Sequence, residues 1–345
     1  MGTTRRRSMW LGWRVRTLVI YRLGSLGDTV VALPGFHRIA QSFPNHRRMV
    51  LTNYSVSAKA APLEAIVGGS GLIDGTIEYP VGMRSVVALW RLARRLQSLR
   101  ASALIYLAAD RGRLSVTRDL LFFRMCGIRN ILGASLLMGA EASRTDPQSG
   151  DEERECLRLA RSLARLGAID LDDPASWDLL LTPQETARGE AAIAPLGGRP
   201  VIAINMGGKI AEKDWGVENW RALIAALAAD LSHMGLVVVG AADESARAEY
   251  ILRDWPGLSR NLCGALSPRE TAAALKGAAA FIGHDSGPMH LAASAGVRCV
   301  ALFGNYTKPR KWHPYGDHHI VHHAKGTVKD IAVPAVVESA RRVLS

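Results

Sequence analysis

The sequence predicts an α/β protein with two Rossmann-like halves, whose parallel sheets face each other across a cleft. Short β-branched runs alternate with longer helical patterns along the whole chain, which is typical of parallel sheets with crossover helices. The chain has 345 residues, more than twice the common domain size of about 150. Glycine turns follow several strands, and open α/β sheets bind their ligands at the carboxyl ends of strands.

The first half begins with a strand at 17–21 that runs into a glycine turn. The other elements expected here are, in order, a helix at 28–43, a strand at 48–52, a helix at 84–100, a strand at 103–107 and helices at 116–126 and 155–166. A linker at 170–183 follows. We therefore assign 1–16 to a basic extension and 17–180 to the first half.

The second half begins with a strand at 200–205 and a second glycine loop. The further elements expected are helices at 218–234, 244–255, 268–277 and 288–296, and strands at 236–240, 280–282 and 298–303. A last helix at 334–344 follows a histidine-rich stretch. We assign 181–330 to the second half and 331–345 to a C-terminal helix.

The charge of the chain is positive and unevenly placed. Lys and Arg number 43 against 31 Asp and Glu, a net charge of +12, and the isoelectric point is near 10.0. Residues 1–100 hold 15 of these cations and 4 of the acids, an excess of 11. This asymmetry indicates a polyanionic partner, such as an anionic bilayer surface, nucleic acid or a phosphorylated glycolipid.

Cysteine spacing and hydropathy indicate a cytoplasmic location. Cys126, Cys156, Cys263 and Cys299 are far apart and lack zinc-site spacing, so we expect reduced thiols in the core. No apolar run approaches the roughly 18 to 20 residues that cross a bilayer. Arginines at 14, 16 and 22 interrupt any signal-peptide core.

The first glycine turn carries an acid. It reads Arg22-Leu-Gly-Ser-Leu-Gly-Asp28, so two glycines and a carboxylate lie where a strand becomes a helix. The spacing is G-x-x-G and differs from the dinucleotide fingerprint G-x-G-x-x-G, which disfavours NAD. Asp28 is either a helix cap or a functional carboxylate.

The segment from 283 to 293 has the pattern of an anion site. Asp285 and Ser286 precede a Gly-Pro step and an alanine-rich helix, which places Pro288 in the first turn and leaves N–H groups free. An ordinary capped helix would also explain Ser286 and Pro288. It would not explain why His284, Asp285 and His290 share this turn.

Two further turns of the second half carry charged residues. The loop from 205 to 216 contains two glycines, Gly207 and Gly208, and Lys213, whose charge could offset that of a leaving diphosphate. A solvated lysine is the alternative. After the next strand, Glu244 could accept hydrogen bonds from ribose hydroxyls, or simply cap a helix.

The stretch from 310 to 323 contains five histidines. Imidazole is a common metal ligand, but no carboxylate or cysteine frames a coordination pattern. We expect a surface strand with exposed histidines and no bound metal.

Taken together, these motifs resemble glycosyltransferase family 9, the ADP-heptose:lipopolysaccharide heptosyltransferases and their relatives. The resemblance covers roughly residues 17–340 and rests on the turn ending at Asp28, on Lys213-Asp-Trp-Gly216, on Glu244 and on Asp285-Ser-Gly-Pro-Met-His290-Leu-Ala-Ala. It implies the GT-B fold, with the acceptor on the N-terminal half and a nucleotide-sugar donor, ADP-heptose being favoured, on the C-terminal half. It further implies transfer with inversion to a glycan or glycolipid, without cofactor or obligatory metal.

The resemblance also implies roles for particular residues. Asp28 would be the general base, and Lys213 would neutralise the diphosphate. The donor-binding residues would be Gly207, Gly208, Lys213, Glu244, Asp285, Ser286, Gly287, Pro288, Met289 and His290. The acceptor-binding residues would be Gly27, Asp28 and Arg111, the last in one of two acceptor loops expected at 53–59 and 108–118.

Other interpretations remain open at this point. The helix at 84–100 places Val86, Leu89, Ala93 and Leu96 on one stripe and arginines near the other, which suits either a packed core helix or peripheral attachment to an anionic membrane. A GT-B nucleotide-sugar epimerase would consume its donor without an acceptor. A nucleic-acid-binding protein would account for the charge, but the chain lacks any recognised nucleic-acid motif.

Overall fold

The computed structural model describes residues 16–54, 61–80, 82, 85–134, 139, 142–208 and 210–345. The basic extension up to residue 15, most of the acceptor loop expected at 53–59 and Lys209 therefore lie outside the described residues.

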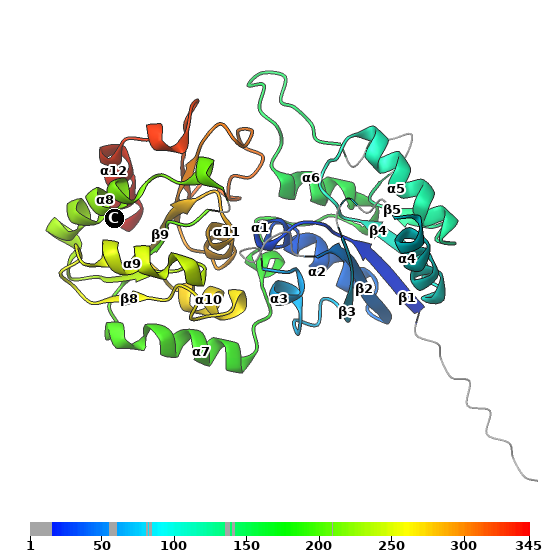
Figure 1. Cartoon of the computed structure of the whole chain (residues 1–345), viewed down its shortest axis with the longest axis horizontal. Helices are drawn as coiled ribbons and strands as arrows, with labels where there is room; N and C mark the ends of the chain where they lie inside the picture. The colour runs from blue at the N-terminus through cyan, green and yellow to red at the C-terminus, as the bar shows by residue number, and fades with distance from the viewer. Residues whose placement is uncertain are drawn as a thin grey trace, which may run out of the picture.

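The first half is built on a parallel sheet with the strand order β3-β2-β1-β4-β5 (Figure 1). Its strands are β1 (Arg16–Tyr21), β2 (His46–Asn53), β3 (Gly75–Tyr79), β4 (Ala103–Tyr106) and β5 (Ile131–Leu132). The central strands are buried on both faces, as their continuous apolar runs require. Its helices are α1 (Leu26–Val30), α2 (Leu33–Ser42), α3 (Glu64–Val67), α4 (Val86–Ser98), α5 (Arg113–Met125) and α6 (Glu155–Ser162).

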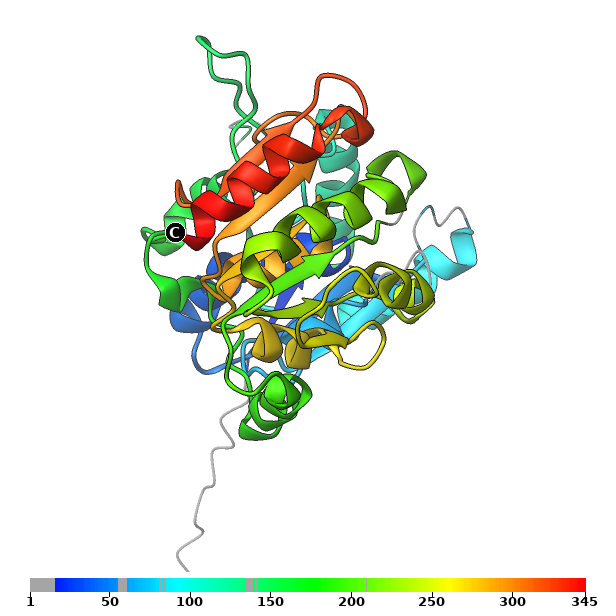
Figure 2. The same cartoon turned by 90° about the vertical axis from the view of Figure 1, so that its left-hand side faces the viewer.

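The second half is built on a parallel sheet with the order β11-β10-β9-β6-β7-β8. Its strands are β6 (Val201–Asn205), β7 (Gly235–Val238), β8 (Ser259–Asn261), β9 (Ala280–His284), β10 (Cys299–Phe303) and β11 (Ile320–His323). Its helices are α7 (Pro183–Ile193), α8 (Val217–Leu231), α9 (Ser245–Leu252), α10 (Pro268–Leu275), α11 (Gly287–Ser294) and α12 (Val333–Leu344). Helices α8 and α12 pack side by side against this sheet (Figure 2).

The expectation of one helix at 28–43 is wrong. The segment forms two helices, with α1 ending at Val30 and α2 beginning at Leu33. Pro34 explains the break, because proline has no N–H to donate to the carbonyl four residues earlier, and its ring clashes with that carbonyl. The short α1 therefore lies as a separate turn at the end of β1.

Only half of the stripe expected on the helix at 84–100 is packed: Leu96 is buried and Ala93 packs against the same core cluster. Helix α4 buries Leu92 and Leu96, whereas Val86 and Leu89 are exposed. The C-terminal part of this helix therefore packs on the core, and much of the apolar surface of its N-terminal part faces outward.

The two halves share buried apolar surface. One core cluster contains Leu18 and Ile20 of β1, Met289 and Leu291 of α11, and Phe281 of β9. A buried arginine reinforces the junction: Arg269 of α10 donates to the main-chain oxygen of Ile66 in α3 at 2.9 Å. These contacts fix the two sheets relative to each other.

Candidate active site between the two sheets

On the first half, Asp28 is held at the start of α1. Its Oδ2 accepts hydrogen bonds from the Ser25 N–H at 2.9 Å and the Ser25 hydroxyl at 3.3 Å. Gly24 has φ +118°, and a Cβ there would lie 2.4 Å from Asp28. A glycine is therefore needed for the turn and for the space that the carboxylate occupies.

Beneath Asp28 lies a buried cluster of charges that the sequence analysis missed. The Arg22 guanidinium, fully enclosed, donates to the main-chain oxygens of Asp28 and Leu107, the latter at 2.7 Å. It also lies 3.8 Å from the Glu155 carboxylate, which pairs with Arg158 at 2.7 Å. Arg158 in turn donates to the main-chain oxygen of Ala108 at 2.8 Å. The cluster thus ties α1 and the segment after β4 to α6.

On the second half, the N-terminus of α11 faces the cleft. Ser286, the residue before the helix, makes no capping bond, and its hydroxyl donates instead to Asn205 Oδ1 at 2.8 Å. Asn205 is itself held at the end of β6 by a hydrogen bond to the Val239 main-chain oxygen. The first-turn N–H groups of α11 are therefore left without a side-chain cap, an arrangement that suits an anion.

Lys213 reaches the same place from the loop after β6. Its Nζ lies 2.5 Å from Asp285 Oδ2 and 5.4 Å from the ring centre of Tyr306. Trp215 anchors this loop, because its indole is fully buried and its main-chain N–H donates to His284 Nε2 at 3.1 Å. Asp285 and Tyr306 therefore hold the lysine side chain at this place, so it is not a freely solvated lysine.

Glu244 lies against two glycines. A Cβ at Gly207 would fall 1.8 Å from Glu244 Oε1, and one at Gly240 would fall 2.0 Å from Oε2. The carboxylate also accepts a hydrogen bond from the Ala241 N–H at 3.1 Å. Any side chain at either glycine would push Glu244 from this position, so the glycines make room for a carboxylate.

Contact between helices α1 and α11 brings the site residues of the first half close to those of the second half. A Cβ at Gly27 would lie 2.9 Å from the His290 ring, and one at Gly287 would lie 2.6 Å from Leu26. Next to this contact is a cleft of about 690 Å³. Its lining includes Gly27, Asp28, Gly207, Gly208, Lys213, Glu244, Asp285, Ser286, Gly287, Pro288 and His290.

Two of the residues expected in the site do not line this cleft. Met289 is fully buried and packs into the shared core, because it faces away from the cleft on α11. Arg111 is not among the residues that line this cleft. Its guanidinium donates to the Tyr21 hydroxyl at 3.0 Å and to Asp119 at 3.1 Å, at the carboxyl edge of the first sheet.

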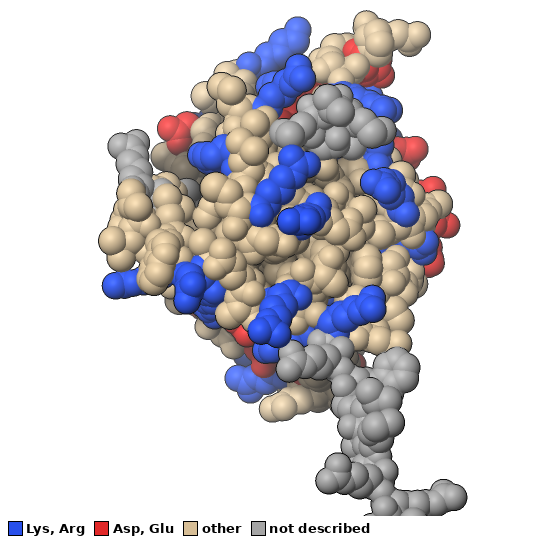
Figure 3. Space-filling model, turned by 90° about the vertical axis from the view of Figure 1, so that its right-hand side faces the viewer, with Lys and Arg blue, Asp and Glu red and all other residues tan. Residues whose placement is uncertain are grey.

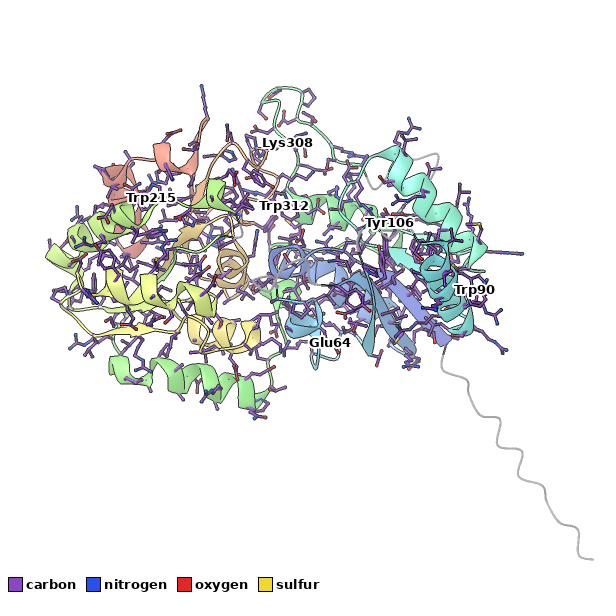
Figure 4. All side chains as sticks on the ribbon, viewed as in Figure 1. Glu64, Trp90, Tyr106, Trp215, Lys308 and Trp312 are labelled. Atoms are coloured by element: carbon purple, nitrogen blue, oxygen red, sulfur yellow. The ribbon has the colours of Figure 1, made fainter. Side chains whose placement is uncertain are left out.

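The loop after β10 contributes lining residues that the sequence analysis did not single out. Tyr306, Thr307 and Trp312 all border the cleft, and Figure 4 shows Trp312 between the two halves. The Trp312 ring lies edge-on to His290, with the ring centres 6.5 Å apart. Burial lowers the pKa of His290, and the nearby Asp285 and Asp28 charges oppose that shift.

The histidine-rich stretch differs from the expected exposed strand. Its strand, β11, is a sheet edge, but of the five histidines only His318 is exposed. The others contact neighbours: His313 Nε2 lies 2.9 Å from His323 Nδ1, and His322 lies 2.9 Å from the Ser339 hydroxyl. Within the part of the chain that the structure describes, no group of three or more His, Cys, Asp or Glu could hold a metal ion.

A buried histidine beside the site makes stability depend on pH. Burial lowers the pKa of His284 to about 4, although the Asp214 charge opposes the shift. Between an unfolded pKa of about 6.5 and this value, only the unfolded chain takes up the proton, so stability is lost as the pH falls. At pH 5 we expect His284 alone to lower the free energy of unfolding by about 2 kcal/mol.

Urea unfolding at pH 7 and pH 5 measures this loss. The variant His284→Gln should lose less stability between the two pH values than the parent protein does. An equal loss in both would assign the pH dependence to other groups, such as His313 and His319, whose pKa values burial also lowers to about 4.

The architecture, two parallel sheets with helices on both faces and a cleft between them, is the GT-B fold. The chain belongs to glycosyltransferase family 9, described as heptosyltransferase, whose model matches residues 145–331. No protein with a curated description matches the chain in sequence.

Solved structures of the same family have the same fold. A family 9 glycosyl transferase from Veillonella parvula superposes with a TM-score of 0.73 at 19% identity, covering 95% of this chain and 97% of that one. ADP-heptose lps heptosyltransferase II of E. coli gives 0.63 at 18%, covering 95% and 98%. The E. coli heptosyltransferase WaaC, solved with ADP-2-deoxy-2-fluoro heptose, gives 0.65 at 17%, covering 94% and 99%.

Proposed function

We propose that this glycosyltransferase moves heptose, or a related sugar, from a nucleotide-sugar donor to a lipopolysaccharide-core or other glycan acceptor, with inversion and without metal or cofactor. ADP-heptose is the favoured donor, because one E. coli relative, the heptosyltransferase WaaC, was solved both with ADP and with ADP-2-deoxy-2-fluoro heptose. One observation carries the proposal: the Asp28 carboxylate and the uncapped N-terminus of α11 line one cleft from opposite halves.

In this mechanism Asp28 is the general base. Its carboxylate takes the proton of the acceptor hydroxyl as the acceptor oxygen bonds to the anomeric carbon. The bond from that carbon to the donor phosphate breaks, and its electron pair leaves with the nucleoside diphosphate. Because attack and departure take place on opposite faces of the carbon, one displacement inverts its configuration.

The second half stabilises the leaving group. The unpaired main-chain N–H groups in the first turn of α11, among which Pro288 offers none, stabilise an anion bound in the cleft, and Lys213 adds a positive charge beside them. Glu244 holds the nucleotide ribose through its carboxylate oxygens, in the space left by Gly207 and Gly240. On the acceptor side, Gly27 permits close approach and Arg111 offers a cation at the edge of the first sheet.

A thermal-shift panel with ADP, GDP, UDP and CDP tests the donor assignment, because a ligand that binds only the folded state raises its melting temperature. We expect the largest rise with ADP. The same nucleotide linked to heptose, incubated without acceptor, should remain unconsumed. Consumption without acceptor would favour an epimerase, and a preference for another nucleotide would exclude ADP-heptose.

Replacing Lys213 by Gln tests the leaving-group role. We expect kcat/KM to fall by about 10²- to 10³-fold, the usual cost of removing one group that stabilises developing negative charge. Lys213→Arg should restore part of the loss, whereas Lys329→Gln, which changes an exposed lysine, should leave the kinetics unchanged. Unaltered kinetics in Lys213→Gln would remove the lysine from the mechanism.

A further inference from the structure

Helices α4 and α5 expose an unusual amount of apolar surface. Val86 and Trp90 of α4 keep 79% and 61% of their surface exposed, and Leu114 and Met125 of α5 keep 90% and 72%. The two helices are neighbours, joined by a hydrogen bond from Gln97 to the Met125 main-chain oxygen at 3.3 Å. Val87, Leu89 and Leu121 extend the same surface. We call this surface the α4–α5 face.

The α4–α5 face is also basic throughout. Its arginines are Arg91, Arg94, Arg95, Arg113, Arg118 and Arg124. Among the residues of α4 and α5, the only acid is Asp119, which is buried and pairs with Arg111 and Arg118. Figure 3 shows this side of the molecule, where Lys and Arg surround a neutral centre and Asp and Glu lie at the margin.

This mixture favours a lipid surface over a protein partner. Protein interfaces are also enriched in arginine, tryptophan and methionine, so the residue types alone do not decide the partner. The charge does: α4 and α5 together carry six arginines and one acid, which is buried, and a surface of one sign suits a polyanionic partner. Arginine attracts anionic headgroups, and tryptophan prefers the boundary between headgroups and acyl chains. The Arg94 guanidinium lies over the Trp90 ring, 5.6 Å from the ring centre. We propose that the α4–α5 face docks on an anionic lipid bilayer.

The position of the face fits this partner. In a parallel sheet, each helix begins near the carboxyl end of the preceding strand. The exposed residues Val86 and Leu114, at the starts of α4 and α5, therefore lie toward the same sheet edge as Asp28. Docking there brings the acceptor side of the cleft to the headgroups. The role of this docking in bringing the acceptor to the cleft rests on the proposed function, whereas the binding of the α4–α5 face to a bilayer does not.

Co-sedimentation of the full chain with vesicles tests the proposal. One set of vesicles contains phosphatidylcholine alone, and the other also contains phosphatidylglycerol. We expect salt-sensitive binding to the anionic vesicles only. The triple variant Arg91→Gln/Arg94→Gln/Arg95→Gln should lose about a hundredfold in partitioning, from about fivefold for each arginine. Trp90→Ser/Met125→Ser should lose about tenfold.

A matched control removes the same charge elsewhere. Arg188, Arg199 and Arg260 are exposed on the second half, and their exchange for Gln should leave binding nearly unchanged. Equal losses in the control and the face variants, or equal binding to both kinds of vesicle, would overturn the proposal. So would sedimentation velocity showing a dimer that the face variants dissociate.

Activity separates this inference from the proposed function. Melting temperatures confirm that each variant is folded, and transfer to a lipid-free acceptor should be the same in the face variants as in the parent. Absence of transfer in the parent, with vesicle binding intact, would count against the proposed function alone.

Discussion

Exchanging Asp28 for Asn should lower kcat about 10²- to 10⁴-fold, the range that general-base catalysis contributes. The amide oxygen of Asn can still accept the hydrogen bond from the Ser25 N–H, so the start of α1 should keep its shape. The donor contacts lie on the other half, and we therefore expect donor affinity to change little. Initial rates and donor binding by calorimetry measure the two effects separately.

A control for local disturbance is Ser25→Ala, which removes the weaker hydroxyl bond to Asp28 but leaves the carboxylate in place. We expect a much smaller loss of kcat there. Retained turnover in Asp28→Asn would remove this residue as the base. A large loss of donor affinity in the same variant would assign it a binding role instead.

Replacing Glu155 by Ala should be strongly destabilising, at about 3 to 5 kcal/mol of unfolding free energy. The substitution leaves Arg22 and Arg158 as two enclosed guanidinium groups without their carboxylate. Burial already lowers the pKa of Arg22, and the Glu155 and Asp28 charges oppose that shift. Urea unfolding measures the loss.

An exposed ion pair supplies the comparison for Glu155. Arg341 and Asp230 lie 2.9 Å apart with about half of each side chain exposed, and Asp230→Ala should cost less than about 1 kcal/mol. A similarly small loss in Glu155→Ala would show that the buried cluster does not hold the first half together. If the Glu155 variant still folds, the weakened support of Asp28 should also lower kcat.

Most of the candidate site could be predicted because its residues follow strands. Asp28 follows β1, Lys213 and Gly207 follow β6, and Ser286 follows β9. The carboxyl ends of parallel strands meet at one edge of a sheet, so sequence position alone brings such residues together within each half. The same rule, applied to both sheets, predicted that the two halves face each other across a cleft. The assignment of donor and acceptor to the two sides rested on the family resemblance.

The misses have local and long-range causes. Met289 has neighbours in the site, but a helix turns by about 100° per residue, which directs it into the core. The strands β3, β5 and β8 were not predicted, because they are short edge strands without strong alternation of apolar and polar residues. Helix α7 directly follows the predicted linker and was not predicted either, although Thr182 and Glu185 form a capping box at its start. The split between α1 and α2 could have been predicted from Pro34.

The buried charge cluster could not be predicted in the same way. Arg22 and Glu155 are far apart in sequence, and nothing in either local pattern marks its partner. The sequence left open whether the apolar residues of α4 are packed or exposed, for a related reason. Which residues of an amphipathic helix are buried depends on its contact with the sheet, and α4 buries Leu92 and Leu96.

A crystal structure with ADP or its sugar conjugate tests the central claim most directly. We expect the diphosphate at the N-terminus of α11, between the Gly287 N–H and Lys213, with the Asp28 carboxylate across the cleft on the anomeric side. A diphosphate bound away from α11, or an Asp28 side chain turned away from the sugar, would contradict the account.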